Sequence, residues 1–197
     1  MTEDELKTYI EAGRESRHLE YKRSESWDDS NFKATITKSV LGMSNIKDGG
    51  TIVIGMDKQE DGSYIPQGVQ PNYLEAFNNE DSIKTHIANF ADPCVDFDVE
   101  IGKYQNKDFV VIIVREFEEL PVICKADGPK NLRKGAVYTR TRRHPETAEV
   151  PSQTEMREIV ELAVDKGMRK LSERGYVLRG QKSSEKLFSE ELNDFDL

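Results

Sequence analysis

Three acidic residues and one lysine in this chain have types and spacing that could do chemistry. Glu15 and Glu20 lie five positions apart in the stretch GRESRHLEYKR, Lys22 follows the second of them, and Asp57 ends a later apolar run. Divalent cations such as Mg²⁺ and Mn²⁺ prefer carboxylate and water oxygens, and a bound cation can activate water and neutralise a phosphate. A lysine beside them can offset charge that builds on phosphoryl oxygens. We therefore predict that Glu15, Glu20 and Asp57 bind Mg²⁺ or Mn²⁺, and that these three and Lys22 are catalytic.

An ordinary charged surface is the alternative interpretation of the same residues. Under it, Glu20 and Lys22 form a weak ion pair in contact with solvent, with a free energy of roughly 0–1 kcal/mol. If the three carboxylates instead lie together without metal, they repel one another. We then expect Glu20→Gln or Asp57→Asn to leave the metal-free protein as stable as before, or slightly more stable.

A basic segment contrasts with the acidic remainder of the chain. The net charge is -9, whereas residues 121–145 hold seven Lys and Arg and one Asp. That segment is therefore +6 and the remainder -15, which is consistent either with a phosphate-binding stripe or with a solvated hairpin. Alternation in TRTRR places Arg140 and Arg142 on one strand face, where they could follow a nucleic-acid backbone. The predicted phosphate contacts are Lys130, Arg133, Lys134, Arg140, Arg142 and Arg143.

Local patterns predict the elements that must position the acids. Strand side chains repeat every two residues, so in HLEYKRS the apolar Leu19 and Tyr21 point to a core while Glu20 and Lys22 share the other face. Residues 31–46 have helical apolar spacing, and KDGG then ends the helix before the apolar strand TIVIGM.

Further patterns predict the rest of the domain. Helices are expected at 3–12, 80–90 and 152–174, the first and last opening with a Thr2–Glu5 and a Ser152–Glu155 capping box. Strands are expected at 95–104, 108–114, 121–125 and 136–143. The order predicts an α+β domain over residues 1–176, with one mixed sheet covered by helices, and a mobile polar tail over 177–197.

Other classes of site have no support in the sequence. There is no GxxxxGK[ST] for an ATP phosphate, the three histidines are far apart, and Cys94 and Cys124 lack metal-ligand spacing. No apolar run reaches about 18 residues, and the N-terminus lacks the features of a secretion signal. We expect a cytoplasmic protein with no membrane contact.

Taken in order, the motifs resemble the Schlafen AlbA-like domain family. ESRHLEYKR, SNIKDGGTIVIGMD, PVICK and GAVYTRTRR correspond to the family patterns E-x4-E-[FY]-K, A-N-T-x-GG-x-[ILV]-x-IG-[VI]-D and a late P-[VIF] followed by a Y-x-R strand. The match runs from about Glu15 to about Ala148. One departure is that three residues separate Asn45 from Gly49 where the family usually has two.

The resemblance implies a nucleic-acid function of one of two kinds. In Schlafen nucleases two glutamates and an aspartate form a metal-dependent endoribonuclease site that acts on structured RNA such as tRNA, which corresponds here to Glu15, Glu20 and Asp57 with Lys22 beside them. RNA is then favoured over DNA, and a role as a bacterial antiviral defence or toxin effector is expected. Other relatives are described as DNA-binding or regulatory proteins. A non-catalytic nucleic-acid-binding module, or an interaction subunit of a larger complex, is therefore the alternative.

The resemblance also bears on assembly. Schlafen nuclease cores join two AlbA-like lobes around RNA, whereas this chain has room for one. We expect a homodimer to rebuild the groove, with the helix over 152–174 as the candidate interface.

Overall fold

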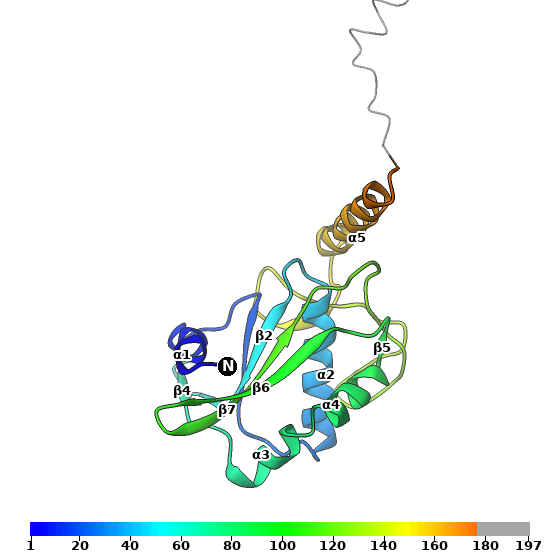
Figure 1. Ribbon diagram of the computed structural model, residues 1–197. Helices are drawn as coiled ribbons and strands as arrows, with labels where there is room; N and C mark the ends of the chain where they lie inside the picture. The colour runs from blue at the N-terminus through cyan, green and yellow to red at the C-terminus, as the bar shows by residue number, and fades with distance from the viewer. Residues whose placement is uncertain (177–197) are drawn as a thin grey trace, which may run out of the picture. The chain divides into compact units, whose positions relative to one another are not determined.

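Four strands form the main sheet in the computed structural model, which describes residues 1–176 (Figure 1). Their order is β1 (Leu19–Lys22), β2 (Gly50–Ile54), β7 (Lys107–Val114) and β6 (Phe97–Tyr104). β1 and β2 are parallel, while the β2–β7 and β7–β6 pairs are antiparallel. This mixed sheet, with helices packed on it, confirms the predicted α+β class.

Two helices cover opposite faces of the sheet. α1 (Glu3–Glu11) buries Leu6 in a cluster with Val53 of β2, whereas α2 (Ser30–Ser44) packs on the face that carries Ile52. Neighbouring residues of one strand point to opposite faces, so the two helices must lie on either side (Figure 1). α2 is also the crossover that makes β1 and β2 parallel.

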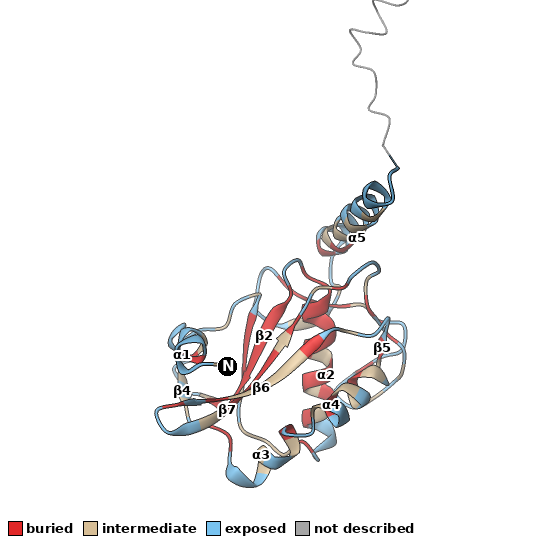
Figure 2. Ribbon diagram, viewed as in Figure 1, coloured by how far each residue is buried: buried red, intermediate tan, exposed pale blue. Residues whose placement is uncertain are grey.

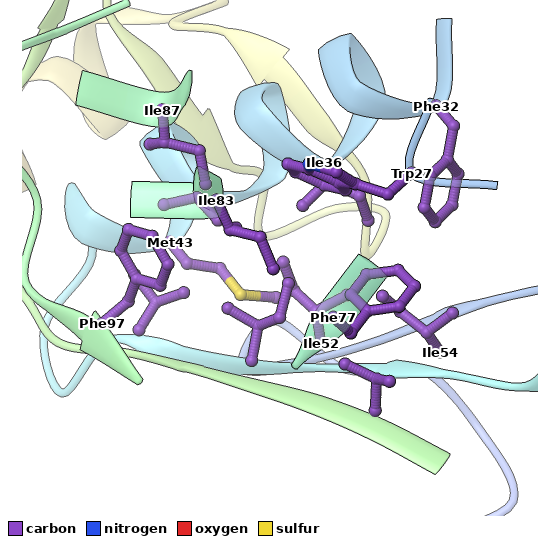
Figure 3. Packing of buried hydrophobic residues seen from close by; sticks show 14 of the residues in the cluster. Trp27, Phe32, Ile36, Met43, Ile52, Ile54, Phe77, Ile83, Ile87 and Phe97 are labelled. Atoms are coloured by element: carbon purple, nitrogen blue, oxygen red, sulfur yellow. The ribbon is translucent and has the colours of Figure 1, made fainter. Parts of the chain in front are cut away.

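The largest part of the core lies under α2, as Figure 3 shows. Phe32, Ile36, Val40 and Met43 recur at helical spacing and are all buried. They meet buried side chains of the sheet, of α4, of the loop that follows β1 and of the helix α3 (Pro71–Phe77). The labelled partners are Trp27, Ile52, Ile54, Phe77, Ile83, Ile87 and Phe97. Figure 2 shows the same pattern as buried residues along β2, β7 and α2.

The remaining elements are short, apart from the last helix. They are α3 (Pro71–Phe77), α4 (Glu80–Ala88), α5 (Gln153–Glu173) and the paired strands β3 (Met56–Lys58) with β4 (Tyr64–Pro66), β5 (Ala91–Asp92) with β8 (Ile123–Cys124), and β9 (Tyr138–Arg140) with β10 (Thr147–Glu149). α3 was not predicted from the sequence. It begins at Pro71, and proline is suited to the first turn of a helix.

Asn45, at the end of α2, connects the sheet layer to the C-terminal strands. Its side-chain amide nitrogen donates to the carbonyl oxygens of Val122 and Tyr138, at 2.8 and 2.9 Å, and its oxygen accepts from the Val122 N–H at 2.8 Å. The side chain is buried, so these backbone groups have a polar partner in place of water. The motif asparagine is thus a structural link between distant segments.

The chain divides into two compact units, residues 1–163 and 164–197, and α5 crosses the division. The predicted tail over 177–197 lies outside the described residues, and the predicted domain end at residue 176 stays a prediction. Within residues 1–176, none of the helices combines the length and the apolar character needed to cross a bilayer.

Candidate active site

Glu20 is a buried member of an ion-pair network. Its side chain is only 6% exposed, because its face of β1 is the one that α2 covers. One carboxylate oxygen lies 2.5 Å from Lys22 Nζ, and the other lies 3.2 Å from Nη1 of Arg140. The sequence pattern correctly placed Glu20 and Lys22 on one face, but the alternative of a solvated surface is wrong for Glu20.

Arg140 is the cation that compensates Glu20, and its side chain is 1% exposed. Its guanidinium also donates to the carbonyl oxygens of Ser16, at 2.9 Å, and of Arg17 and Leu19, both at 3.4 Å. The prediction that Arg140 contacts phosphate is therefore wrong. β9 ends at Arg140, so Arg142 lies beyond the strand and the strand face expected to carry both arginines does not form.

Glu15 lies in the loop that precedes β1 and faces two tyrosines. Its Oε1 accepts the Tyr21 N–H at 3.0 Å, which fixes the carboxylate over the strand. Burial, followed by the charge of Glu15, raises the pKa of Tyr64. The Tyr21 and Tyr64 rings lie 4.7 Å apart, so they form one wall beside the carboxylate. Tyr64 therefore stays protonated at neutral pH and can donate to Glu15 or to a ligand.

Two adjoining hollows meet at Glu15 and Lys22, which line both. The lysine hollow, of about 340 Å³, is lined by Glu15, Glu20, Lys22, Thr35, Lys38, Ser39, Lys130, Pro145, Glu146 and Thr147. The carboxylate hollow, of about 550 Å³, is lined by Glu15, Tyr21, Lys22, Arg23, Glu25, Met56, Asp57, Lys58, Gln59 and Tyr64. Glu20 thus lines the first and Asp57 the second.

The three predicted metal ligands are distributed over these two hollows. Among residues 1–176, no three His, Cys, Asp or Glu side chains are placed so that they could hold one metal ion. A preformed site built from Glu15, Glu20 and Asp57 together is therefore not what this structure contains. The reason is that Glu20 points toward Arg140 under α2, whereas Asp57 lies on the β3–β4 hairpin beyond β2.

The remaining predicted phosphate ligands lie at different places on the surface. Lys130 lines the lysine hollow. Arg133 binds both oxygens of Glu149, at 2.6 and 2.7 Å, and Arg142 lies 2.5 Å from Glu158. Both arginines remain more than half exposed, so these pairs leave them accessible to a ligand. Lys134 and Arg143 are exposed.

Two site residues were not predicted from the sequence. Lys38 of α2 lines the lysine hollow, with Nζ 5.1 Å from the centre of the Tyr138 ring, and Tyr64 lines the carboxylate hollow. α2 is defined by its apolar face, and Lys38 follows the buried Thr37. The position of this lysine on the helix relative to the apolar face was therefore the one signal that could have indicated Lys38. Tyr64 had no comparable signal, because its position depends on the β3–β4 pairing.

Comparisons with known proteins place the chain in a family. Residues 15–149 match the family described as Schlafen, AlbA_2. Among curated proteins, none matches the chain.

Two solved structures align with most of this chain. A crystal structure of the DIP2311 protein from Corynebacterium diphtheriae aligns with 79% of this chain and with 28% of its own length, at 13% identity and a TM-score of 0.48. A solution NMR structure of the N-terminal domain of an ATP-dependent DNA helicase RecG-related protein from Nitrosomonas europaea aligns with 78% of this chain and 98% of that domain, at 19% identity and a TM-score of 0.48.

Proposed function

Because the chain belongs to the Schlafen AlbA_2 family, which indicates a nucleic-acid-related function, we propose that it is a metal-dependent endoribonuclease acting on structured RNA such as tRNA. One observation carries the proposal: two carboxylates, Glu15 and Asp57, line the same hollow as Lys22. This combination of acids and an ammonium group suits a phosphodiester whose charge must be neutralised while water attacks.

The residues present fit a Mg²⁺ or Mn²⁺ ion that is completed by substrate. Mg²⁺ keeps several waters and is commonly held by one or two carboxylates together with substrate phosphates, so three protein ligands are not required. Glu15 and Asp57 would hold the ion. When bound, it would supply charge neutralisation at the phosphate and lower the pKa of a coordinated water.

The other site residues have roles that the contacts support. Glu20 holds Lys22 Nζ at 2.5 Å and so fixes the ammonium group where both hollows meet. Lys22 would bind a phosphoryl oxygen there. Lys38 and Lys130 would bind a neighbouring phosphate in the lysine hollow, and the protonated Tyr64 hydroxyl would orient Glu15.

RNA as the substrate and a homodimer as the assembly belong to the same proposal. The resemblance to Schlafen nucleases favours RNA over DNA. Two copies would supply the second lobe that those nucleases have within one chain. Interaction with a further protein in a larger complex, and a defence or toxin role, remain compatible with this assignment.

Cleavage of tRNA by the purified chain with Mn²⁺, and its absence with EDTA, tests the proposal. Asp57→Asn and Glu15→Gln should each abolish cleavage, while Glu60→Gln, an exposed carboxylate on the same hairpin, should not. Circular dichroism should show that all three variants are folded. Cleavage that persists in both site variants, or that is independent of divalent metal, would contradict the proposal.

A non-catalytic nucleic-acid-binding module is the second candidate, and it could take DNA or RNA. The observation that favours it concerns Glu20, one of the three acids expected from the family. Both of its carboxylate oxygens form ion pairs, one with Lys22 and one with Arg140. The same experiment separates the candidates, because retention of nucleic acid without cleavage supports the binding module.

A further inference from the structure

A third hollow borders the carboxylate hollow and shares Arg23, Glu25 and Asp57 with it. This amide hollow, of about 680 Å³, is lined by Arg23, Ser24, Glu25, Ser26, Asp29, Asp57, Gln67, Gly68, Gln70 and Tyr73. Its volume falls within the range of roughly 300–1,000 Å³ that is usual for sites of small organic groups. It has no lining residue in common with the lysine hollow. The three hollows therefore adjoin in the order lysine, carboxylate, amide.

Two glutamine side chains give the amide hollow its chemistry. Gln67 and Gln70 are exposed, and an amide side chain offers both a donor and an acceptor. The Gln70 backbone N–H is bound to Ser24 Oγ at 2.9 Å, and its side chain does not cap α3, although Gln70 is the cap residue. The backbone of Gln70 is thus fixed, while its side-chain amide can bind a ligand. Tyr73 adds a half-buried aromatic ring.

The charge of the amide hollow decides against a phosphate ligand. Three carboxylates, on Glu25, Asp29 and Asp57, line it, whereas its one cation, Arg23, lies 2.5 Å from Glu25. A phosphate would be repelled, but the edge of a nucleobase is neutral and its exocyclic amino group donates to carboxylate and amide oxygens. Unpaired RNA bases are recognised in this way, by stacking on aromatic rings and by hydrogen bonds to their edges.

We infer that the amide hollow binds one unpaired nucleobase of the RNA, next to the phosphate at Glu15, Lys22 and Asp57, and that it selects a base with an exocyclic amino group over uracil. The inference rests on the proposed function, because it places the scissile phosphate in the carboxylate hollow. Because Asp57 lines both hollows, a strand that continues past it on this side puts its next nucleotide into the amide hollow. Gln67 and Gln70 read the base edge, and Tyr73 contacts its face.

Fluorescence anisotropy with short RNAs in EDTA tests the inference without cleavage. The probes are labelled seven-nucleotide uridine RNAs with a single central adenosine, cytidine, guanosine or uridine. A hydrogen bond from the exocyclic amino group, which uracil lacks, should strengthen binding of the amino-bearing probes about tenfold over the uridine probe. The double variant Gln67→Ala/Gln70→Ala should reduce that ratio to near one while the affinity for the uridine probe is kept.

Two control variants make the outcome specific. Gln153→Ala, an exposed glutamine outside the three hollows, should keep the preference, and Lys130→Ala should weaken all four probes equally. Binding of all probes with equal affinity, or a preference that survives in the double glutamine variant, would overturn the inference and leave the cleavage assay to decide the nuclease proposal. Absence of binding to every probe, both in EDTA and in a repeat with Ca²⁺ supplied in place of EDTA, would contradict the inference and the RNA substrate together.

Discussion

Glu20 and Arg140 form a buried pair whose members are separated by most of the domain sequence. Removing one partner of such a pair leaves an uncompensated charge in a site with little water, which costs about 3–5 kcal/mol. We therefore predict that Glu20→Gln lowers the free energy of unfolding by about 3 kcal/mol, the reverse of the expectation drawn from repulsion among three carboxylates. Urea unfolding in EDTA measures the change.

Glu15→Gln is the matched control for that prediction. The Glu15 carboxylate accepts a hydrogen bond from the Tyr21 backbone N–H, and the amide oxygen of a glutamine can accept the same bond. The unfolding free energy of Glu15→Gln should therefore differ from wild type by less than about 1 kcal/mol. Equal stability of Glu20→Gln and wild type would show that Arg140 does not depend on the carboxylate.

His86 makes the stability of the domain depend on pH. Burial, followed by the charge of Lys33, lowers the pKa of His86, which packs against Trp27 and Phe90. The unfolded chain therefore binds a proton more readily than the folded one, and stability is lost as pH falls below about 6.5 toward the lower folded-state pKa. We predict that the melting temperature falls between pH 7.5 and 5.5.

The variant His86→Phe should flatten this pH dependence, and His144→Phe, at an exposed position, should not. Thermal melts across the same pH range measure both. An equally steep slope in His86→Phe would assign the effect to other groups.

At the scale of elements, short-range patterns were reliable. The Thr2–Glu5 capping box is present, and in the Ser152–Glu155 pair the Glu155 N–H bonds the serine hydroxyl, because the groups lie within one turn. The ion pair of Glu20 was not predictable in the same way, since its partner Arg140 comes from a strand that is distant in the sequence. The alternation that correctly described β1 failed at β9, which is only three residues long.

The residues that line the hollows were also predictable only in part, because some of them come together through contacts between distant segments. The sequence predicted one site from Glu15, Glu20, Lys22 and Asp57. Glu15, Lys22 and Asp57 line the carboxylate hollow, whereas Glu20 lines only the lysine hollow. Lys38 and Tyr64 enter the site through helix and hairpin packing, which spacing along the chain does not encode.

Asn45 gives a prediction for the joint between α2 and the C-terminal strands. Asn45→Ala removes three hydrogen bonds and leaves backbone groups of Val122 and Tyr138 buried without a partner. Each unsatisfied buried group costs about 1–3 kcal/mol, so we expect the unfolding free energy to fall by at least about 2 kcal/mol.

Chemical unfolding of Asn45→Ala and of Asn31→Ala, an exposed asparagine of α2, measures the difference. A stability within about 0.5 kcal/mol of wild type for Asn45→Ala would mean that water replaces the side chain.

At the scale of the whole molecule, the proposed homodimer can be tested on α5. Met156, Val160, Val164, Met168 and Leu171 recur at spacings of three and four, so they share one side of the helix, and each is 40–52% exposed. Burying a valine side chain is worth roughly 1.5 kcal/mol or more. Val164→Glu should therefore raise the dimer Kd by at least about tenfold.

Sedimentation equilibrium of the full chain measures that constant, with Arg169→Glu, which changes a charge on the same helix, as the control. A wild-type chain that is monomeric at every concentration would contradict the homodimer.

The pairing of Glu20 with Arg140 also constrains how this protein can diverge. A lineage that loses Glu20 before Arg140 passes through an intermediate with a buried, uncompensated arginine, and that intermediate is counter-selected for folding whatever the activity of the protein. The two positions should therefore covary: relatives should retain both charges, or replace both by apolar residues. Selection for a stable fold would then retain Glu20 in addition to any selection for its chemical role.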